Sequence, residues 1–375
     1  MNKRVAIIWR YLPDYRVAFY RGLKEYLLQR DIELELIHGP TNGYGLNGTT
    51  EDAVPWAKCV NHWSATIGGI EVCWQPYSPY IRDVDLVIVE QANRLLLNYW
   101  LIARRPFCRQ KIAFWGHGRD LQTSPRTVRN AWKRLFVTHV DWWFAYTEQV
   151  KEELVKCAFP AERITNVQNA IDTAALLRAK SEISDQQLNR LKQHLGLGVG
   201  PIGIYCGRIY KEKRIEFLLE TCRRVREQIP SFELIVIGSG EEKGKVISAA
   251  RNGQWLHYVG PRYGDERVPY FLLADVFLMP GLVGLAVLDS FALEVPMVTT
   301  KFPFHSPEVV YLRNNENGLV TENRIDDYVA GICELLADPD RLARVKSGCR
   351  KAASIYTMQT MVENFGGGIV SCLET

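Results

Sequence analysis

Short apolar runs alternate with longer amphipathic stretches along the whole chain, in two successive series. The runs of the first series span residues 5–9, 33–37, 86–90, 111–114 and 142–146. The runs of the second series span residues 202–206, 232–237, 256–259, 276–279 and 297–299. A short apolar run followed by an amphipathic helix is typical of βα units around a parallel sheet. The pattern therefore predicts an α/β protein with two doubly wound sheets.

A chain of 375 residues is longer than one hydrophobic core usually serves, so we expect two domains. The first is predicted over residues 1–173 and the second over 197–354, joined by the polar, helix-favouring segment 174–196. A glycine-rich G-x-G-x-G cluster at residues 196–200 follows this segment, but it precedes a strand. A loop that cradles phosphate must follow a strand and open a helix. The cluster is therefore predicted to end the connection.

The composition excludes several classes of protein. With 47% hydrophobic and 23% charged residues the chain is typical of a globular protein, and no apolar run approaches the roughly 18 residues of a membrane span. The apolar run at residues 5–9 is too short for a signal peptide, which favours a cytoplasmic protein, or one peripheral to the inner face of the cell membrane. Nine scattered cysteines without C-x-x-C spacing indicate neither a disulfide framework nor a zinc site.

Basic residues are concentrated between residues 94 and 134, where ten Lys or Arg face a single acid, Asp120. This asymmetry suggests an anionic partner such as a membrane surface or a phosphorylated acceptor, and no nucleic-acid reader motif accompanies it. At the end of this basic region, residues 126–139 carry apolar side chains at helical spacing, which predicts an apolar stripe along one helix. A surface helix packed on the core is the favoured interpretation, and an interfacial helix on anionic lipid is the alternative.

Five segments in order carry a resemblance to a known family. They are Asn169-Ala170-Ile171-Asp172, residues 207–214 (GRIYKEKR), residues 235–240 (IVIGSG), Val259-Gly260, and residues 280–289 (PGLVGLAVLD). Together they resemble family 4 of the glycosyltransferases, which have the GT-B fold. The resemblance implies two facing Rossmann-like domains, with the C-terminal helix (about 355–375) crossing back to the first. It also implies a UDP- or GDP-linked sugar donor and transfer with retained anomeric configuration.

Arg208 and Lys213 match the diphosphate clamp of that family. The departing nucleoside diphosphate gains negative charge as the glycosidic bond breaks, so the site needs fixed cations. Arg208 follows a strand end and its planar fork suits two phosphate oxygens, while Lys213 offers a point charge. We predict that both stabilise the leaving group, without a metal ion or another cofactor.

The remaining donor-side candidates follow from the same resemblance: Gly207, Gly238, Gly260, Gly284, Leu285, Ala286, Asp289 and Glu308. The amides of Gly284, Leu285 and Ala286 open a helix and should face the phosphates. Asp289 stands where the family has a ribose-binding Glu. Glu308 suits either a sugar hydroxyl or a helix cap, and Gly238 suits either a nucleotide-binding turn or a plain strand-to-helix turn.

One residue departs from the family pattern. A Glu that normally holds hydroxyls of the donor sugar, eight residues before the ribose-binding acid, is replaced by Gly281, and its loop is three residues shorter than usual. We interpret the P-G-x-V-G-L form as a variant. The departure keeps open two alternatives, a catalytically inactive nucleotide-binding or scaffold subunit and a GT-B nucleotide-sugar epimerase.

Candidates for the acceptor side lie after strand ends of the first domain. His117, in a glycine-flanked turn, matches a family His near the donor sugar, and we predict that it acts in catalysis by hydrogen bonding to the sugar or a phosphate. Asp14 and Arg16 suit either acceptor contact or a packed helix start, and Glu90 and Asn93 are further candidates. A D-x-D sequence at residues 83–85 leads directly into a strand, so we do not predict a metal site there.

The sequence as a whole predicts a metal-independent hexosyltransferase in surface polysaccharide biosynthesis, with a glycan or lipid-linked acceptor. The identities of the sugar, the nucleobase and the acceptor depend on pocket shape, which sequence patterns do not specify.

Overall fold

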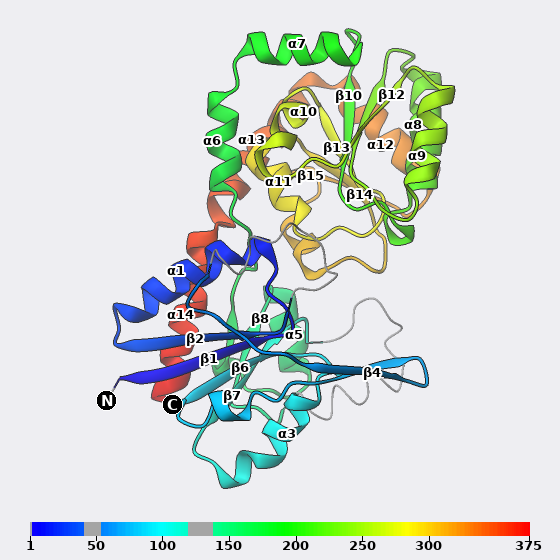
Figure 1. The fold of residues 1–375 in the computed structure, drawn as a ribbon. Coiled ribbons are helices and arrows are strands. Elements are labelled where there is room, and N and C mark those ends of the chain that lie inside the picture. The colour runs from blue at the N-terminus through cyan, green and yellow to red at the C-terminus, as the bar shows by residue number, and fades with distance from the viewer. Residues whose placement is uncertain (1, 41–53, 119–137) are drawn as a thin grey trace. The chain divides into compact units, whose positions relative to one another are not determined.

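The computed structural model describes residues 2–40, 54–118 and 138–375, and the chain divides into two compact units (Figure 1). The first unit comprises Met1–Asp172 together with Thr357–Thr375, and the second comprises Thr173–Tyr356. The polypeptide therefore returns to the first unit at its C-terminal end.

The first unit is built on a parallel sheet with the order β3-β2-β1-β6-β7-β8-β9. Its strands are β1 (Lys3–Trp9), β2 (Ile32–His38), β3 (Lys58–Cys59), β6 (Leu86–Glu90), β7 (Lys111–Gly116), β8 (Trp142–Ala145) and β9 (Ile164–Asn166). Val5 pairs with Leu34 on one side and Leu86 on the other, so β1 is central. Helices of this unit are α1 (Val17–Leu28), α3 (Leu96–Arg104), α5 (Glu148–Lys156) and α14 (Met358–Glu374).

The C-terminal helix α14 packs within the first unit, as expected. Phe365 stacks on Phe144 of β8 at 4.1 Å between ring centroids, and the Lys111 ammonium donates to the carbonyl of Cys372 at 2.7 Å. Gly22 of α1 lies so close to Val362 that an added Cβ would stand 3.1 Å from that side chain. Burial of these apolar residues fixes α14 against both α1 and the sheet.

The second unit is built on a parallel sheet with the order β12-β11-β10-β13-β14-β15. Its strands are β10 (Ile202–Cys206), β11 (Glu233–Ile237), β12 (Leu256–Gly260), β13 (Val276–Leu278), β14 (Met297–Thr300) and β15 (Gly318–Thr321). Its helices are α6 (Ala174–Glu182), α7 (Asp185–Leu195), α8 (Ile215–Gln228), α9 (Lys243–Asn252), α10 (Val268–Leu272), α11 (Ala286–Leu293), α12 (Ile325–Ala337) and α13 (Pro339–Ile355).

The segment predicted as a connection forms the two helices α6 and α7, and contacts group both with the second unit. Helix α7 begins with a capping box between Ser184 and Gln187 and ends at Gly196, whose φ is 69°. That left-handed conformation favours glycine and closes the helix. The first glycine of the G-x-G-x-G cluster therefore ends α7, and the rest of the cluster leads into β10.

All ten predicted strands are present, but an antiparallel hairpin of β4 (Trp63–Ile67) and β5 (Ile70–Trp74) was not predicted. The nine cysteines are all free thiols. Within the described residues, every helix is too short or too polar to cross a membrane.

Candidate functional site

The strand order of the second unit reverses around β10, because β11 lies on one side of it and β13 on the other. Loops that follow β10 and β13 leave the carboxyl edge toward opposite faces of the sheet, and open parallel sheets bind ligands in the crevice this creates. Arg208 and Lys213 lie in the first of these loops, and Gly281 and Gly284 lie in the second. The fold thus brings these sequence candidates to one edge.

Arg208 presents an exposed guanidinium at the carboxyl end of β10. Its backbone is fixed, since the carbonyl of Arg208 accepts a hydrogen bond from the Tyr205 hydroxyl at 2.8 Å. Its side chain forms no hydrogen bond or ion pair with any residue that the structure describes. The planar fork therefore keeps its donors for an anionic ligand.

Lys213 places a second cation beside the same edge, but inside the protein. Only 8% of Lys213 is exposed, and its ammonium donates to the carbonyl of Leu282 at 2.5 Å. Burial opposes the charged form and lowers the pKa of Lys213 from 10.5 to about 8. An anion at this edge would offset the loss of hydration around Lys213.

Gly281 explains why this chain lacks the Glu expected at that position. An added Cβ would stand 2.2 Å from the carbonyl oxygen of Glu212 and within 2.8 Å of the Lys213 backbone. The Leu282 amide also donates to the Glu212 carbonyl at 2.9 Å. The shortened loop packs directly on the turn that carries Lys213, and this packing leaves no room for any side chain at 281.

The N-terminus of α11 lies at the end of this loop. Gly284 and Leu285 precede Ala286, the first residue of α11, and the first amides of an α-helix have no partner within it. His305 holds the loop, since its Nδ1 accepts from the Val283 amide at 3.0 Å and its Nε2 donates to the Thr300 carbonyl at 2.8 Å. Burial lowers the pKa of His305, which keeps the ring neutral in this bridging role.

Gly238 allows two neighbouring loops of this edge to touch. Its φ is 144°, and an added Cβ would stand 1.9 Å from the carbonyl oxygen of Gly207, the residue before Arg208. Gly240 approaches the Ile209 carbonyl in the same way, at 2.1 Å from its added Cβ. Close packing of loop on loop thus supplies a structural reason for these glycines. Gly260 ends β12 with a φ of 74° and open space around it.

Asp289 is buried, and an arginine that the sequence analysis missed occupies both of its carboxylate oxygens. Arg267 donates to Asp289 Oδ2 at 2.7 Å and to Oδ1 at 2.9 Å, leaving the Asp289 side chain 4% exposed. Burial raises the pKa of Asp289, and the guanidinium opposes that rise. Ribose binding by Asp289 stays a prediction, with Arg267 as an unforeseen neighbour. The two residues are 22 positions apart, and no local pattern signals their pairing.

Glu308 lies in the short helical turn Pro307–Tyr311, and only 2% of the residue is exposed. Its contact with a sugar hydroxyl stays a prediction.

The first unit has a corresponding edge, where the strand order reverses around β1. Arg16 begins α1 here but is only 2% exposed. Its guanidinium donates to the Asn169 side chain and to the Ala170 carbonyl, and it lies 5.1 Å from the Trp115 ring centroid. The structure therefore favours the packed helix start over acceptor contact for Arg16. Both terminal nitrogens of its guanidinium donate hydrogen bonds inside the unit.

His117 is exposed after β7, as its glycine-flanked turn predicted. Its ring meets Tyr146 edge-on at 4.4 Å between centroids, and Gly118 follows with a φ of 69°. This packing orients the imidazole while leaving it accessible to a ligand.

Asp14 is exposed in the turn before α1, while Glu90 and Asn93 are partly buried after β6. The Arg94 guanidinium lies 3.8 Å from a carboxylate oxygen of Glu90 and 3.8 Å from a carboxylate oxygen of Glu71 in the β4–β5 hairpin. The acidic candidate Glu90 therefore belongs to a charge network at this edge.

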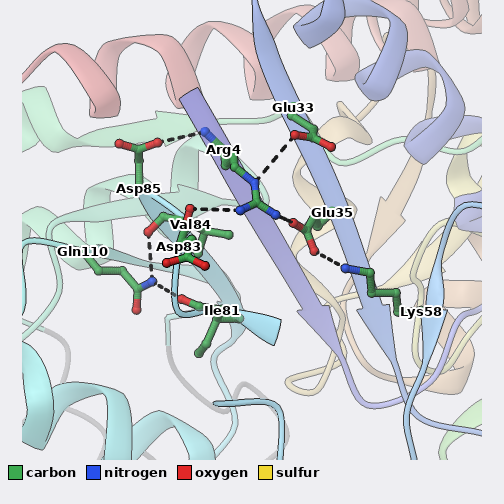
Figure 2. Close-up of polar contacts among 9 residues, drawn as sticks. All are labelled: Arg4, Glu33, Glu35, Lys58, Ile81, Asp83, Val84, Asp85 and Gln110. Carbon is green, nitrogen blue, oxygen red and sulfur yellow. Dashed lines mark hydrogen bonds and ion pairs between the residues drawn. The ribbon is translucent and has the colours of Figure 1, made fainter. Parts of the chain in front are cut away.

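The D-x-D sequence lies at the opposite, amino end of β6 (Figure 2). Asp85 accepts from the Arg4 amide at 2.8 Å and from the Lys3 ammonium at 3.0 Å, and the Asp83 carbonyl faces the Arg4 guanidinium. Burial raises the pKa of Asp85, but these donors outweigh it and the pKa lies below its usual value. Both aspartates thus tie strands together.

No group of three or more potential metal ligands gathers anywhere in the described ranges, and metal-independent action stays a prediction. The basic segment 119–134 and most of the predicted helix 126–139 lie outside the described residues. The described site candidates thus form two groups, one at the carboxyl edge of each sheet.

Residues 200–338 match the family model described as glycosyl transferases group 1. This range runs from β10 to α12 and includes Arg208, Lys213 and Asp289. The second unit therefore contains a group 1 glycosyltransferase domain.

Two curated proteins are similar to this chain. An uncharacterized glycosyltransferase of Haemophilus influenzae is 24% identical over 264 residues, which are 68% of this chain and 69% of that protein. Alpha-monoglucosyldiacylglycerol synthase of Acholeplasma laidlawii is 22% identical over 192 residues, which are 49% of this chain and 47% of that protein.

Solved structures share the fold over nearly the whole chain. A glycosyltransferase from Rickettsia africae has a TM-score of 0.73 at 12% identity, covering 99% of this chain and 98% of its own. The Anabaena protein HepE in complex with UDP has a TM-score of 0.71 at 12% identity, covering 98% and 100%. The chain thus has the GT-B fold of two parallel-sheet, Rossmann-like units.

Proposed function

We propose that this chain is a retaining, hexosyltransferase-type glycosyltransferase that uses a UDP- or GDP-linked sugar. Its acceptor is a glycan or lipid-linked molecule in surface polysaccharide biosynthesis, at the inner face of the cell membrane. The observation that carries the proposal is the exposed guanidinium of Arg208 at the strand-order reversal of a group 1 glycosyltransferase domain. This guanidinium has no hydrogen-bond or ion-pair partner among the described residues.

The proposed donor site combines three sources of positive charge. Arg208 provides a bidentate fork and Lys213 a buried ammonium, and the N-terminus of α11 provides the positive end of its helix dipole. The bond between the anomeric carbon and the diphosphate oxygen breaks, and the bond to the acceptor oxygen forms on the same face. The acceptor proton passes to the departing phosphate oxygen. Stabilisation of the developing charge by these groups is the main catalytic contribution of the protein.

The same charges support action without a metal ion. A divalent cation serves some transferases by neutralising the leaving diphosphate. Here that neutralisation is supplied by Arg208, which precedes the turn Lys211–Lys213, and by Lys213, which ends it. No other cofactor is part of the proposal.

The acceptor is proposed to bind at the carboxyl edge of the first sheet. His117 is exposed there, with Asp14, Glu90 and Asn93 on neighbouring loops. The name of the Acholeplasma relative denotes a glycolipid synthase, which supports a lipid-linked acceptor. The basic segment 94–134 is a proposed contact with an anionic membrane surface.

Gly281 favours one rival, an inactive nucleotide-binding subunit, because no side chain at that position can hold the donor sugar. An activity assay distinguishes the active transferase from this inactive subunit. In it, the purified chain is incubated with UDP- and GDP-sugars and with membrane lipid or glycan extracts. Proton NMR would follow the anomeric signal of the sugar and the release of nucleotide.

The proposal expects nucleotide release only when an acceptor is present, with the donor's anomeric configuration kept in the product. Arg208→Ala should lower kcat/KM by about a hundredfold or more. Nucleotide binding without any transfer would favour the inactive subunit, and release of a free, epimerised sugar would favour an epimerase.

A further inference from the structure

The hairpin of β4 and β5 has two chemically different faces. In its antiparallel register Trp63 pairs with Trp74 and Ala65 with Val72, and directly paired residues share a face. Ile67 lies on this same face, since side chains alternate along a strand. The opposite face carries Ser64, Thr66, Cys73 and Glu71.

The polar face is attached to the protein through its two β5 residues, Glu71 and Cys73, while Ser64 and Thr66 of β4 are exposed. Glu71 accepts from Arg10 at 2.9 Å and lies 3.8 Å from Arg94. Cys73 is fully buried, and its amide donates to the Arg94 carbonyl at 2.7 Å. Arg10 and Arg94 follow β1 and β6, so the hairpin is fixed at the carboxyl edge of the first sheet.

The apolar face is left exposed to solvent. Trp63 is 75% exposed, Ile67 67% and Trp74 37%, and all five residues of β4 are exposed. Figure 1 shows the hairpin, labelled at β4, extending from the first unit on the side away from the N-terminus. A soluble sheet normally buries its apolar face, so this arrangement is reversed and marks an interaction surface.

We propose that the outward face of the β4–β5 hairpin inserts into the interfacial region of a lipid membrane. Tryptophan prefers this region, because its ring is apolar and its N–H finds a partner at the headgroup level. The inference rests on the proposed function only for its purpose, the delivery of a lipid-linked acceptor to the adjacent edge.

The size of the face favours lipid over a protein partner. Two strands of five residues span about 17 Å by roughly 10 Å, which gives on the order of 200 Å². Stable protein interfaces bury about 800 Å² on each partner. A membrane needs no matched surface, so a few large apolar side chains suffice.

The charges at the base of the hairpin also suit a membrane. Glu71 is the only acid in the two strands, and the hydrogen bond from Arg10 lowers its pKa and compensates its charge. Arg94, which is 40% exposed, lies 3.8 Å from Glu71 and adds a second positive charge at this base. Cations near the inserted face attract anionic lipid headgroups.

The test uses the full chain and vesicles of equimolar phosphatidylglycerol and phosphatidylcholine, with flotation to measure partitioning. The double variant Trp63→Ser, Ile67→Ser should lower the partition coefficient at least tenfold. Leu28→Ser is the matched control, because Leu28 is 68% exposed in the same unit but lies outside both the hairpin and the basic segment 94–134. Leu28→Ser should partition like the wild type.

Nucleotide affinity measured in solution separates this inference from the proposed function. Both variants should bind nucleotide as the wild type does, which also shows that they are folded. The proposal would be overturned if the wild-type protein did not bind vesicles, or if wild type and double variant partitioned equally. Equal loss of partitioning on Leu28→Ser would also overturn it. So would a wild-type dimer that the double variant converts to a monomer, since the partner would then be a second copy.

Discussion

Lys213 shows how a single residue is tuned by its surroundings. It is a buried cation whose hydrogen bond to the Leu282 carbonyl connects the loops that follow β10 and β13. Its folded pKa of about 8 lies below the unfolded value of 10.5, so the unfolded chain binds more protons between those pH values. Lys213 therefore opposes folding at neutral pH, and stability gains as pH rises from about 8 to 10.5. Under the proposed function, the charge of Lys213 stabilises a bound diphosphate in return for this cost.

Nucleotide binding should therefore take up protons near pH 8. Lys213 is about half protonated there, and an adjacent diphosphate raises its pKa, so binding should take up about half a proton. The nucleotide's own phosphates, with a second pKa of about 6, are already ionised. Calorimetry in buffers of different ionisation enthalpy measures the uptake.

Lys213→Arg is the control for this proton uptake, because a guanidinium does not titrate in this range. It should bind nucleotide with no proton exchange. Equal uptake by the wild type and the variant would show that Lys213 does not face the diphosphate.

Gly281 provides a second prediction at the residue scale. Gly281→Glu restores the family residue, but its Cβ would meet the Glu212 carbonyl at 2.2 Å. We expect the variant to lose about 2–4 kcal/mol of unfolding free energy in the second unit and to gain no activity. Urea unfolding followed by circular dichroism measures the loss.

Gly244→Ala is the matched control, because an added Cβ there meets nothing within 4 Å. It lies in α9 and should stabilise that helix by about 0.5–1 kcal/mol. A Gly281→Glu variant as stable as the wild type would mean that the loop adapts and that the close packing is not required.

The individual site residues were predictable to different extents. Arg208 and Lys213 could be identified as candidates because they follow a predicted strand end within residues 207–214, which resemble the diphosphate clamp of the family. Arg267 could not, since its role depends on a carboxylate that comes near only when the sheet forms. The sequence left two interpretations of Arg16 open, contact with the acceptor and a packed helix start. Its contacts with Asn169 and Trp115 in the folded unit favour the second.

At the scale of elements, Arg16 links three segments of the first unit. It begins α1, donates to Asn169 and Ala170 in the turn that closes the unit, and contacts the Met361 sulfur of α14 at 3.4 Å. A buried arginine of this kind holds elements that are distant in sequence. Removing it leaves the oxygens of that turn without their donors.

Arg16→Met should therefore loosen α1 and α14 while sparing the second unit. We expect about 2–4 kcal/mol less protection of the amides in both helices, read by hydrogen exchange with mass spectrometry. Glu25→Gln, at an exposed position of α1, should leave exchange within about 0.5 kcal/mol of the wild type. Unchanged protection in Arg16→Met would contradict a structural role for this residue.

The central strands were predictable because burial on both faces makes them continuous apolar runs. The hairpin was missed although its signal is present in the sequence. Trp63, Ala65 and Ile67 alternate with polar residues, and the pair Gly68-Gly69 separates the strands. That pattern is typical of a hairpin. The alternation pattern does not specify that the apolar face of this hairpin is the one exposed to solvent.

At the scale of the whole molecule, the chain makes two Rossmann-like units and returns to the first through α14. The predicted boundary at residue 173 lies beside the division between Asp172 and Thr173. The return was expected near residue 355, and the structure divides the units after Tyr356, where Thr357 caps α14. The helical tendency of segment 174–196 could be predicted from sequence, but the contacts that place it in the second unit depend on folded surfaces.

The central claim is that the carboxyl edge of the second unit binds a nucleoside diphosphate through Arg208. Its most direct test is calorimetric titration with UDP, GDP, ADP and their sugar conjugates, on wild type and Arg208→Ala. Arg251→Ala, at an exposed position ending α9, serves as the matched control. We predict micromolar binding of one nucleotide series, unchanged by Arg251→Ala and weakened about tenfold to hundredfold by Arg208→Ala. Absence of binding by every nucleotide, or equal affinity in Arg208→Ala, would contradict the account.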